Sequence, residues 1–264
     1  KKLAGNAKIS KGSLNELKGK VSNLDKQNTS LSKKNKNLHF KNNKLKDTLK
    51  DFATKVVEVK DKLRGNIAKD LAREFKKANL NVLVDEKTGN VVLLMNEDFR
   101  FKKNSFRLNK TAKKTLKKII PIYSKVLFGS KVIGEKIQSF NIIGHASPSF
   151  KGKFIEPLSN NNVAYSYNMR LSAQRAASIT NYIFGRHVGN YEFKKKLKSY
   201  TSAIGKGFTK PVRTMRVGRG LASTATKNCG PFDCYGSQRV ELSFTLREDV
   251  KSLNKIINMA KDVK

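Results

Sequence analysis

The stretch "NMRLSAQRAASITNYI", residues 168–183, carries a basic side chain at a position where it could do chemistry. A stripe of apolar residues with helical spacing predicts a helix packed on a core: Ala176, Ile179 and Ile183. Ser172 is a candidate N-cap residue, which would place Arg175 in the first turn of that helix. Helix N-termini favour anions. An arginine there therefore indicates either a small cost in stability or a site where the guanidinium and the amide groups hold an anion together.

The remaining reactive side chains give no catalytic or metal-binding set. Two cysteines and three scattered histidines are a poor inventory for a structural zinc site, which needs four ligands. His145 ends a predicted strand and is expected to be structural. The sequence therefore predicts no catalytic residue, no metal and no cofactor.

The two cysteines, Cys229 and Cys234, lie close together in "CGPFDC". In an oxidising compartment they could close a small disulfide loop. The alternative is a pair of free thiols in a surface loop.

The charge of the chain is extreme, with a formal net charge of +36 over 264 residues. Such a charge indicates a polyanionic partner or surroundings. Nucleic acid, an anionic membrane surface and an acidic wall polymer all qualify. No apolar run is long enough to span a membrane, and the sequence begins "KKLAG", so we expect a membrane anchor upstream of residue 1.

Residues 13–63 follow a heptad pattern without a slip. One row consists of Leu14, Val21, Asn28, Asn35, Asn42, Leu49, Val56 and Leu63. The other row consists of Leu17, Leu24, Leu31, Leu38, Leu45, Phe52 and Val59. The first row is the a position of the heptad and the second row is the d position. Buried asparagine at a favours a parallel two-stranded coiled coil in one register. We expect a homodimeric rod, although the many lysines beside the seam repel. The alternative is a lone helix folded onto the following domain.

The rest of the chain predicts an α+β fold. A hairpin with its turn at 87–90, a helix over 109–127, a strand over 137–143, an irregular stretch over 147–167, the helix described first and a strand over 239–246 follow one another. This order gives a βαβαβ sandwich, a mixed sheet with helices on one face, preceded by the long coiled-coil helix. The expected domains are a rod over 1–66, the sandwich over 67–250 and a basic helix or tail over 251–264.

Four blocks in order resemble the OmpA-like peptidoglycan-binding domain family, which includes the C-terminal domains of MotB stator subunits and Pal lipoproteins. The blocks are "IIGHAS", "NMRLSAQRAASITNYI", "AIGKGFTKP" and "SQRVELSF", and the match covers roughly 90–246. The resemblance implies non-covalent binding of the peptidoglycan stem peptide, at the carboxylate of its diaminopimelate residue, without catalysis.

The resemblance also implies which residues bind. The family pattern N-x-x-L-S-x-x-R-A stands here with Asn168, Ser172 and Arg175, and its carboxylate-binding arginine falls on Arg175. Guanidinium binds a carboxylate through two hydrogen bonds. Where the family has an acid for the ligand's ammonium group, this chain has Ser147. Glu156, in the long stretch that follows, is the candidate substitute.

Taken together, these observations predict a periplasmic protein that anchors an envelope complex to peptidoglycan. A paired coil favours a stator-type, MotB-like tether to an inner-membrane partner over an outer-membrane lipoprotein. The alternative function is a basic nucleic-acid-binding protein with a dimerising coiled coil. The dispersed charge and the lack of a nucleic-acid fold signature argue against nucleic acid.

Overall fold

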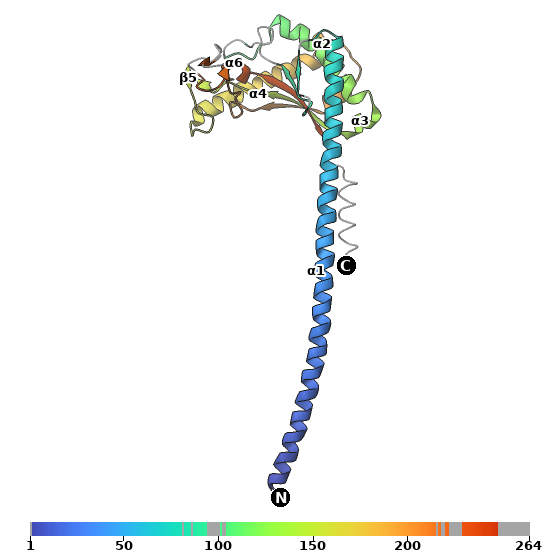
Figure 1. The fold of residues 1–264 in the computed structure, drawn as a ribbon. Coiled ribbons are helices and arrows are strands. Elements are labelled where there is room, and N and C mark those ends of the chain that lie inside the picture. Colours follow the sequence, from blue (N-terminus) through green and yellow to red (C-terminus); the bar gives the residue numbers. More distant parts are fainter. Residues whose placement is uncertain are drawn as a thin grey trace. The chain divides into compact units, whose positions relative to one another are not determined.

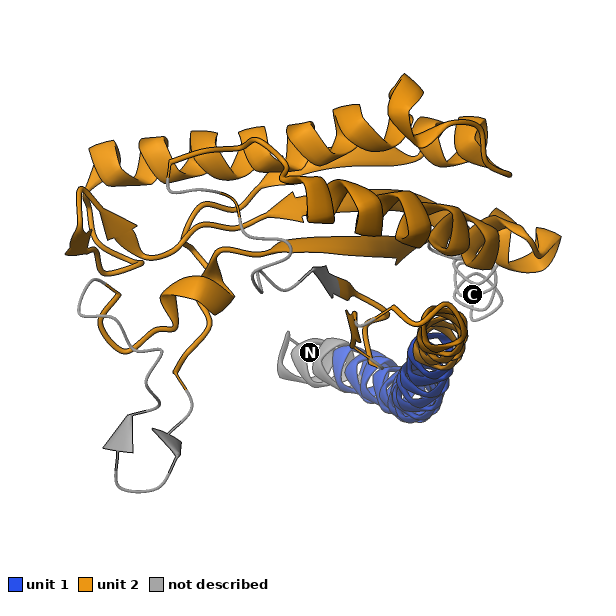
Figure 2. Cartoon of the chain, turned by 90° about the horizontal axis from the view of Figure 1, so that it is seen from above, with its two compact units in different colours: residues 1–58, 249–264 blue, residues 59–248 orange. Residues whose placement is uncertain are grey.

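The computed structural model describes residues 2–80, 82–85, 87–93, 101, 104–214, 216–217, 220–221 and 229–247 (Figure 1). For residues 2–11, 92–93, 216–217 and 220–221 it describes the backbone alone. The predicted C-terminal helix or tail over 251–264 lies outside these residues. The chain divides into two compact units, Lys1–Glu58 with Asp249–Lys264, and Val59–Glu248 (Figure 2).

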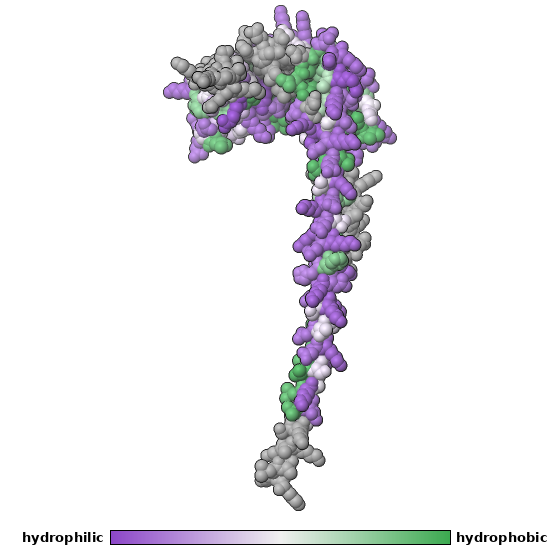
Figure 3. Space-filling model, viewed as in Figure 1, coloured by the Kyte–Doolittle hydropathy of each residue, from purple (hydrophilic) through white to green (hydrophobic). Residues whose placement is uncertain are grey.

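The first unit consists mainly of helix α1, Lys2–Lys77, which continues into the second unit. Six apolar residues of the heptad rows are between 52% and 59% exposed: Leu14, Leu17, Val21, Leu24, Leu31 and Leu38. Hydrophilic residues cover most of the visible helix, with separate hydrophobic patches between them (Figure 3). The long helix is confirmed, and its apolar seam is open along this part of the chain.

The last turns of α1 belong to the core of the second unit. Ile67, Leu71 and Phe75 are buried in the main hydrophobic cluster, and Leu63 packs against it. Leu63 also fits the heptad pattern, so the pattern runs past the point where the helix begins to pack on the domain.

The second unit is built on a five-stranded mixed sheet with the order β1-β2-β9-β3-β6. The strands are β1 (Leu83–Val84), β2 (Val91–Leu93), β3 (Ile137–Gly144), β6 (Thr201–Gly205) and β9 (Val240–Leu246). β3 and β6 are parallel, and the pairs β1–β2, β2–β9 and β9–β3 are antiparallel. The predicted hairpin is therefore present, and the α+β class is confirmed.

One face of the sheet is apolar because side chains alternate along each strand. Phe140 and Ile142 of β3 and Leu242 and Phe244 of β9 are buried in the core cluster. The opposite face is polar and includes a hydroxyl pair, Ser139 with Thr245, at 2.6 Å. Two of the helices, Lys110–Phe128 and Asn162–Phe184, pack on the apolar face (Figure 2).

Two long helices cover that face. α2 (Lys110–Phe128) begins at Asn109, whose side chain accepts a hydrogen bond from the amide of Ala112, and buries Leu116, Ile120 and Leu127. α4 (Asn162–Phe184) buries Ala176, Ile179 and Ile183. The predicted apolar stripe of α4 is thus the face that meets the sheet.

Short elements complete the described unit. They are α3 (Lys131–Lys136), β4 (Ser149–Phe150), β5 (Lys153–Phe154), the 3-10 turn η1 (Arg186–Val188), α5 (Lys194–Ser199), β7 (Arg216–Val217), β8 (Gly220–Leu221) and α6 (Cys234–Ser237). β4 pairs with β5 across the turn residues Lys151 and Gly152, which both have positive φ. The prediction of an irregular 147–167 stretch was wrong, because it contains this hairpin and the start of α4.

Candidate functional site

The position of Arg175 in its helix differs from the prediction. α4 begins at Asn162, and the side chain of Asn161 caps it by accepting a hydrogen bond from the amide of Ala164 at 3.0 Å. Ser172 is therefore not an N-cap, and Arg175 lies in the fourth turn. In that turn the backbone amides donate hydrogen bonds within the helix, so they are not available to bind an anion together with the Arg175 guanidinium.

Arg175 is almost completely buried, with 2% of its surface exposed. Its Nε donates to the carbonyl oxygen of Ser105 at 3.2 Å, and its Nη1 donates to that of His145 at 3.4 Å. The guanidinium carbon lies 5.1 Å from the centre of the Phe101 ring. The segment before α2 and the loop after β3 thus hold the guanidinium from two sides.

No acidic side chain among the described residues forms an ion pair with Arg175. Burial lowers the pKa of Arg175 to about 10, against a smaller opposing effect of Tyr167. At neutral pH the group is therefore still a cation. Within the described part of the chain, carbonyl oxygens and a ring surround this buried cation, which is suited to receive an anion because burying a charge without a counter-charge is costly.

Ser172 is fully buried and fixes a neighbouring loop. Its hydroxyl donates to the carbonyl oxygen of Met169 at 2.8 Å and accepts from the amide of Gly207 at 2.9 Å. Gly207 in turn accepts a hydrogen bond from the amide of Ala146 at 2.7 Å. In the described structure, Ser172 thus joins α4 to the loops that follow β3 and β6.

Two glycines allow α4 to lie directly on the sheet at this point. A Cβ on Gly144 would lie 2.1 Å from the carbonyl oxygen of Ser172, and a Cβ on Gly205 would lie 2.7 Å from the amide nitrogen of Ala173. Both contacts are with helix backbone, which has little room to move. The glycines therefore set the distance between the sheet and the turn of α4 that carries Arg175.

Asn168 and Ser147 meet at the β4–β5 hairpin. Asn168 donates through Nδ2 to the carbonyl oxygens of Ser149 at 3.2 Å and Ala164 at 3.0 Å. The hydroxyl of Ser147 lies 3.0 Å from that of Ser149 and accepts from Nε2 of Gln238 at 3.3 Å. Both predicted residues are buried; Asn168 ties the hairpin to α4, and Ser147 ties it to Gln238, which follows α6.

His145 lies in a small polar cluster behind Arg175. Its Nε2 is 3.4 Å from Oε1 of Glu241, which is also 2.6 Å from Nε of Arg239. Burial alone would raise the pKa of Glu241, but the contact with His145 and the charge of Arg239 outweigh it and lower the pKa to about 2. Arg239 and Glu241 lie on one face as the alternation predicts, so this carboxylate compensates a charge other than that of Arg175.

Glu156 lies in the connection between β5 and α4, with an exposed side chain. Its carbonyl oxygen accepts a hydrogen bond from the amide of Ser159 at 2.9 Å. Among the described residues its carboxylate makes no ion pair. The connection therefore presents one free acid at the end of the hairpin.

Sequence reasoning missed the neighbours that give Arg175 its surroundings, Phe101 and Ser105. It also missed a hollow of about 230 Å³ beside them. This hollow is lined by Asn104, Tyr167, Arg170, Leu171 and Gln174. The spacing of four residues from Leu171 to Arg175 could have indicated a shared face, but the contribution of Phe101, Asn104 and Ser105 depends on long-range packing.

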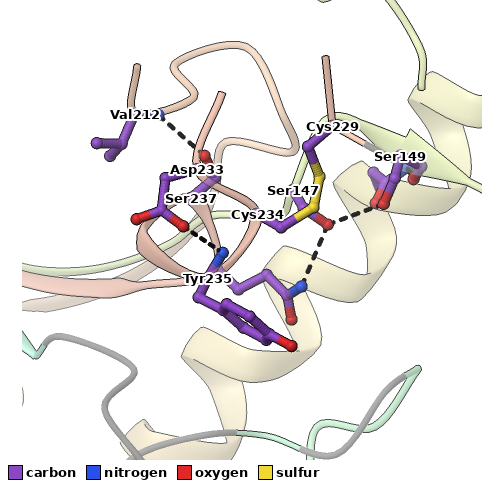
Figure 4. The surroundings of a disulfide bond; sticks show 10 residues. Ser147, Ser149, Val212, Cys229, Asp233, Cys234, Tyr235 and Ser237 are labelled. Atoms are coloured by element: carbon purple, nitrogen blue, oxygen red, sulfur yellow. Dashed lines mark hydrogen bonds between the residues drawn. A yellow bond between two sulfur atoms is a disulfide. The ribbon is translucent and has the colours of Figure 1, made fainter. Parts of the chain in front are cut away.

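Cys229 and Cys234 form a disulfide with Cα atoms 5.6 Å apart (Figure 4). Ser147 and Ser149 lie beside it (Figure 4). α6 begins at Cys234, and the amide of Val212 donates to the Ser237 hydroxyl at 2.9 Å. The cross-linked loop thus stands against the hairpin that carries Ser149.

Two further features bear on function. In the described part of the chain, no group of three or more His, Cys, Asp or Glu side chains is arranged to hold a metal ion. Across the same residues, no helix combines the length and apolar content that crossing a bilayer requires.

No protein-family model and no curated protein matches the chain. Among solved structures, it is similar to the periplasmic domain of Helicobacter pylori MotB, at 15% identity over 67% of this chain and 88% of that one, with a TM-score of 0.40. It is similar to a MotB-like protein from Desulfovibrio vulgaris, at 13% identity over 74% and 96%, with a TM-score of 0.41. It is also similar to an OmpA-like domain from Francisella tularensis, at 18% identity over 63% and 82%, with a TM-score of 0.35.

Proposed function

We propose that the protein binds the peptidoglycan stem peptide without catalysis, through the carboxylate of its diaminopimelate residue, and anchors an envelope complex to the cell wall. The observation that carries this proposal is Arg175, a buried cation with no acidic partner among the described residues. A ligand carboxylate would supply the missing counter-charge through charge-assisted hydrogen bonds. The proposed approach is the hollow lined by Asn104, Leu171 and Gln174, which are neighbours in sequence or on the helix of Ser105 and Arg175.

The test is co-sedimentation with purified peptidoglycan sacculi at physiological salt. We expect the chain to sediment with sacculi and to be released by a soluble diaminopimelate-containing peptide. The competing function is nucleic-acid binding, which the net charge of +36 favours. Retention on nucleic acid at physiological salt, together with no binding to sacculi, would establish that alternative instead.

Two copies of the protein are proposed to act together through α1, as a stator-type subunit tethered to the inner membrane on the periplasmic side. The seam from Leu14 to Leu38 is exposed on an isolated chain and has the heptad spacing of a parallel dimer. The asparagines at 28, 35 and 42 would then face each other across the seam. Pairing would remove from water the apolar side chains that the single helix exposes.

Changing Asn28, Asn35 and Asn42 together to Ile is expected to raise the melting temperature of the helix and to loosen its choice of oligomer, because buried asparagine costs stability and specifies a dimer. Sedimentation at moderate salt, which screens the flanking lysines, measures the oligomer. Asn37→Ile, off the seam, is the matched control. A wild-type monomer with α1 folded against the α+β unit would contradict the rod.

Glu156 is proposed to replace the acid that the family has at the position of Ser147. We expect Glu156→Gln to weaken binding of a diaminopimelate peptide by about 1 kcal/mol, the scale of a charged hydrogen bond. Binding of an analogue that lacks the ammonium group should not change. Glu135→Gln, on exposed α3, is the control. Equal losses for both ligands would show that Glu156 does not contact the ammonium group.

A further inference from the structure

A second, larger hollow lies on α4 about two turns before Arg175. Its volume is about 610 Å³, and it opens between the β4–β5 hairpin and the first turns of the helix. Its lining residues are Phe150, Asn162, Val163, Ser166, Tyr167 and Arg170. None of these residues was predicted from the sequence as part of a site.

The hairpin wall of this hollow is held in place from behind. A two-residue strand pair is not stable alone in water. Here Phe154 of β5 lies 6.3 Å from the ring of Phe232 in the disulfide loop. A Cβ on Gly230 of the same loop would lie 3.0 Å from the Phe154 ring. The cross-linked loop therefore supports the hairpin on the side away from the hollow.

The hairpin is also tied to α4 from the front. The Asn168 side chain donates to the carbonyl oxygen of Ser149, and the ring of Phe150 lies 5.4 Å from that of Tyr167 at an angle of 60°. Two tilted aromatic rings thus form one corner of the hollow without a ligand. A surface formed in advance loses little conformational entropy on binding.

The chemistry of the lining is mixed in a particular way. Phe150, Tyr167 and Val163, which is 69% exposed, offer apolar surface. Asn162 and Ser166 add uncharged hydrogen-bonding groups, and Arg170 makes no ion pair or hydrogen bond among the described residues. An apolar partner would make no ion pair with Arg170, and a simple polyanion would make no apolar contact with the two rings. A pyranose ring uses both, because its C–H face packs on aromatic rings while its substituents meet polar groups.

The larger hollow shares part of its lining with the smaller one beside Leu171 and Gln174. Tyr167 and Arg170 line both hollows. From Tyr167 to Arg175 the helix rises about 12 Å, which is the span of a short glycopeptide. A ligand held at Arg175 by one end would therefore reach the Phe150 corner with its other end.

We propose that this larger hollow binds the sugar to which the stem peptide is attached: a pyranose ring on Phe150, Val163 and Tyr167, with Arg170 holding a carboxylate a few bonds from it. The proposal rests on the proposed function and extends it from the peptide to the glycan. Arg175 and Arg170 would then each bind one of two acidic groups of the same ligand.

The experiment compares three soluble probes by calorimetry with the full chain. They are a diaminopimelate-containing tetrapeptide, the same tetrapeptide on its N-acetylated disaccharide, and the disaccharide alone. We expect the disaccharide–tetrapeptide to bind about tenfold more tightly than the free peptide, which corresponds to about 1.4 kcal/mol. Val163→Asn and Phe150→Leu should remove most of this advantage and leave the free-peptide affinity within about twofold. Val132→Asn, at a 72% exposed position on α3, is the matched control and should keep it.

The outcomes separate the two proposals. Equal affinity of the wild-type chain for peptide and disaccharide–peptide would overturn the sugar site while leaving the peptide site intact. An advantage that survives both Val163→Asn and Phe150→Leu would overturn it as well. Binding of the disaccharide alone, lost in these variants, with no binding of the peptide, would support the sugar site and overturn the peptide site. Failure of all three probes to bind would overturn both.

Discussion

Replacing Arg175 with Gln is expected to reduce binding to peptidoglycan sacculi by about 10- to 150-fold, which corresponds to about 1.5–3 kcal/mol for a charge-assisted hydrogen-bonded pair. The loss should be large because the guanidinium is 2% exposed and has no acidic partner among the described residues. A carboxylate that reaches it would be screened little by water or salt. Co-sedimentation over a range of sacculus concentrations measures the change.

The controls separate charge from geometry and from folding. Arg175→Lys keeps the charge but loses the planar fork, so it should recover only part of the affinity. Arg186→Gln removes an exposed cation near the end of the same helix and should change binding little. Circular dichroism establishes that each variant is folded. A folded Arg175→Gln protein that binds sacculi as well as the wild type would exclude this residue as the carboxylate site.

Replacing Gly144 with Ala is expected to destabilise the α+β unit by about 3 kcal/mol, near the upper end of overpacking effects. The added Cβ would lie 2.1 Å from the carbonyl oxygen of Ser172, and 3.0 Å from its carbonyl carbon. Relief requires β3 and α4 to separate at the turn that supports Arg175. The melting temperature should fall by about 6–12 °C.

Near-UV circular dichroism is the appropriate measurement, because the long α1 helix dominates the far-UV signal. Gly134→Ala is the matched control, since its nearest neighbour is the flexible end of Lys196, at 3.2 Å from the new Cβ. This control should change stability by less than about 0.5 kcal/mol. A melting temperature for Gly144→Ala equal to that of the wild type would show that the helix does not rest on the sheet at this glycine.

Much of the architecture follows from patterns that extend over a few residues. The apolar run 137–143 and the alternation in 239–246 predict two strands, and the structure pairs them side by side. The apolar spacing within 109–127 predicts a helix whose two ends lie within one residue of those in the structure. The start of α4 does not follow. Asn161, directly before the helix, and Ser172, within it, are both acceptable N-cap residues by type, and packing selects Asn161.

The residues of the candidate site can be identified from local sequence patterns, but the burial of their side chains cannot. Arg175 stands out in the sequence through the family pattern and through its expected place in the first turn of a helix, although the structure places it in the fourth turn. Ser147, Asn168 and Ser172 stand out through the family pattern. In the structure, however, all three make hydrogen bonds within the protein: Ser147 with Gln238, Asn168 with the β4–β5 hairpin, and Ser172 with Gly207. Their part in placing the loops around Arg175 could not be read from spacing.

Charge, the heptad seam, the strand and helix periods and the unusual arginine are properties of the sequence, because each depends on residue type and on neighbours within a few positions. The fold alone brings Ser105 to Arg175 across 70 residues, and places Glu241 beside His145 by pairing β9 with β3. Which buried charge is compensated therefore depends on sheet register and helix packing. These are long-range choices, made by the burial of the whole apolar face rather than by any local pattern.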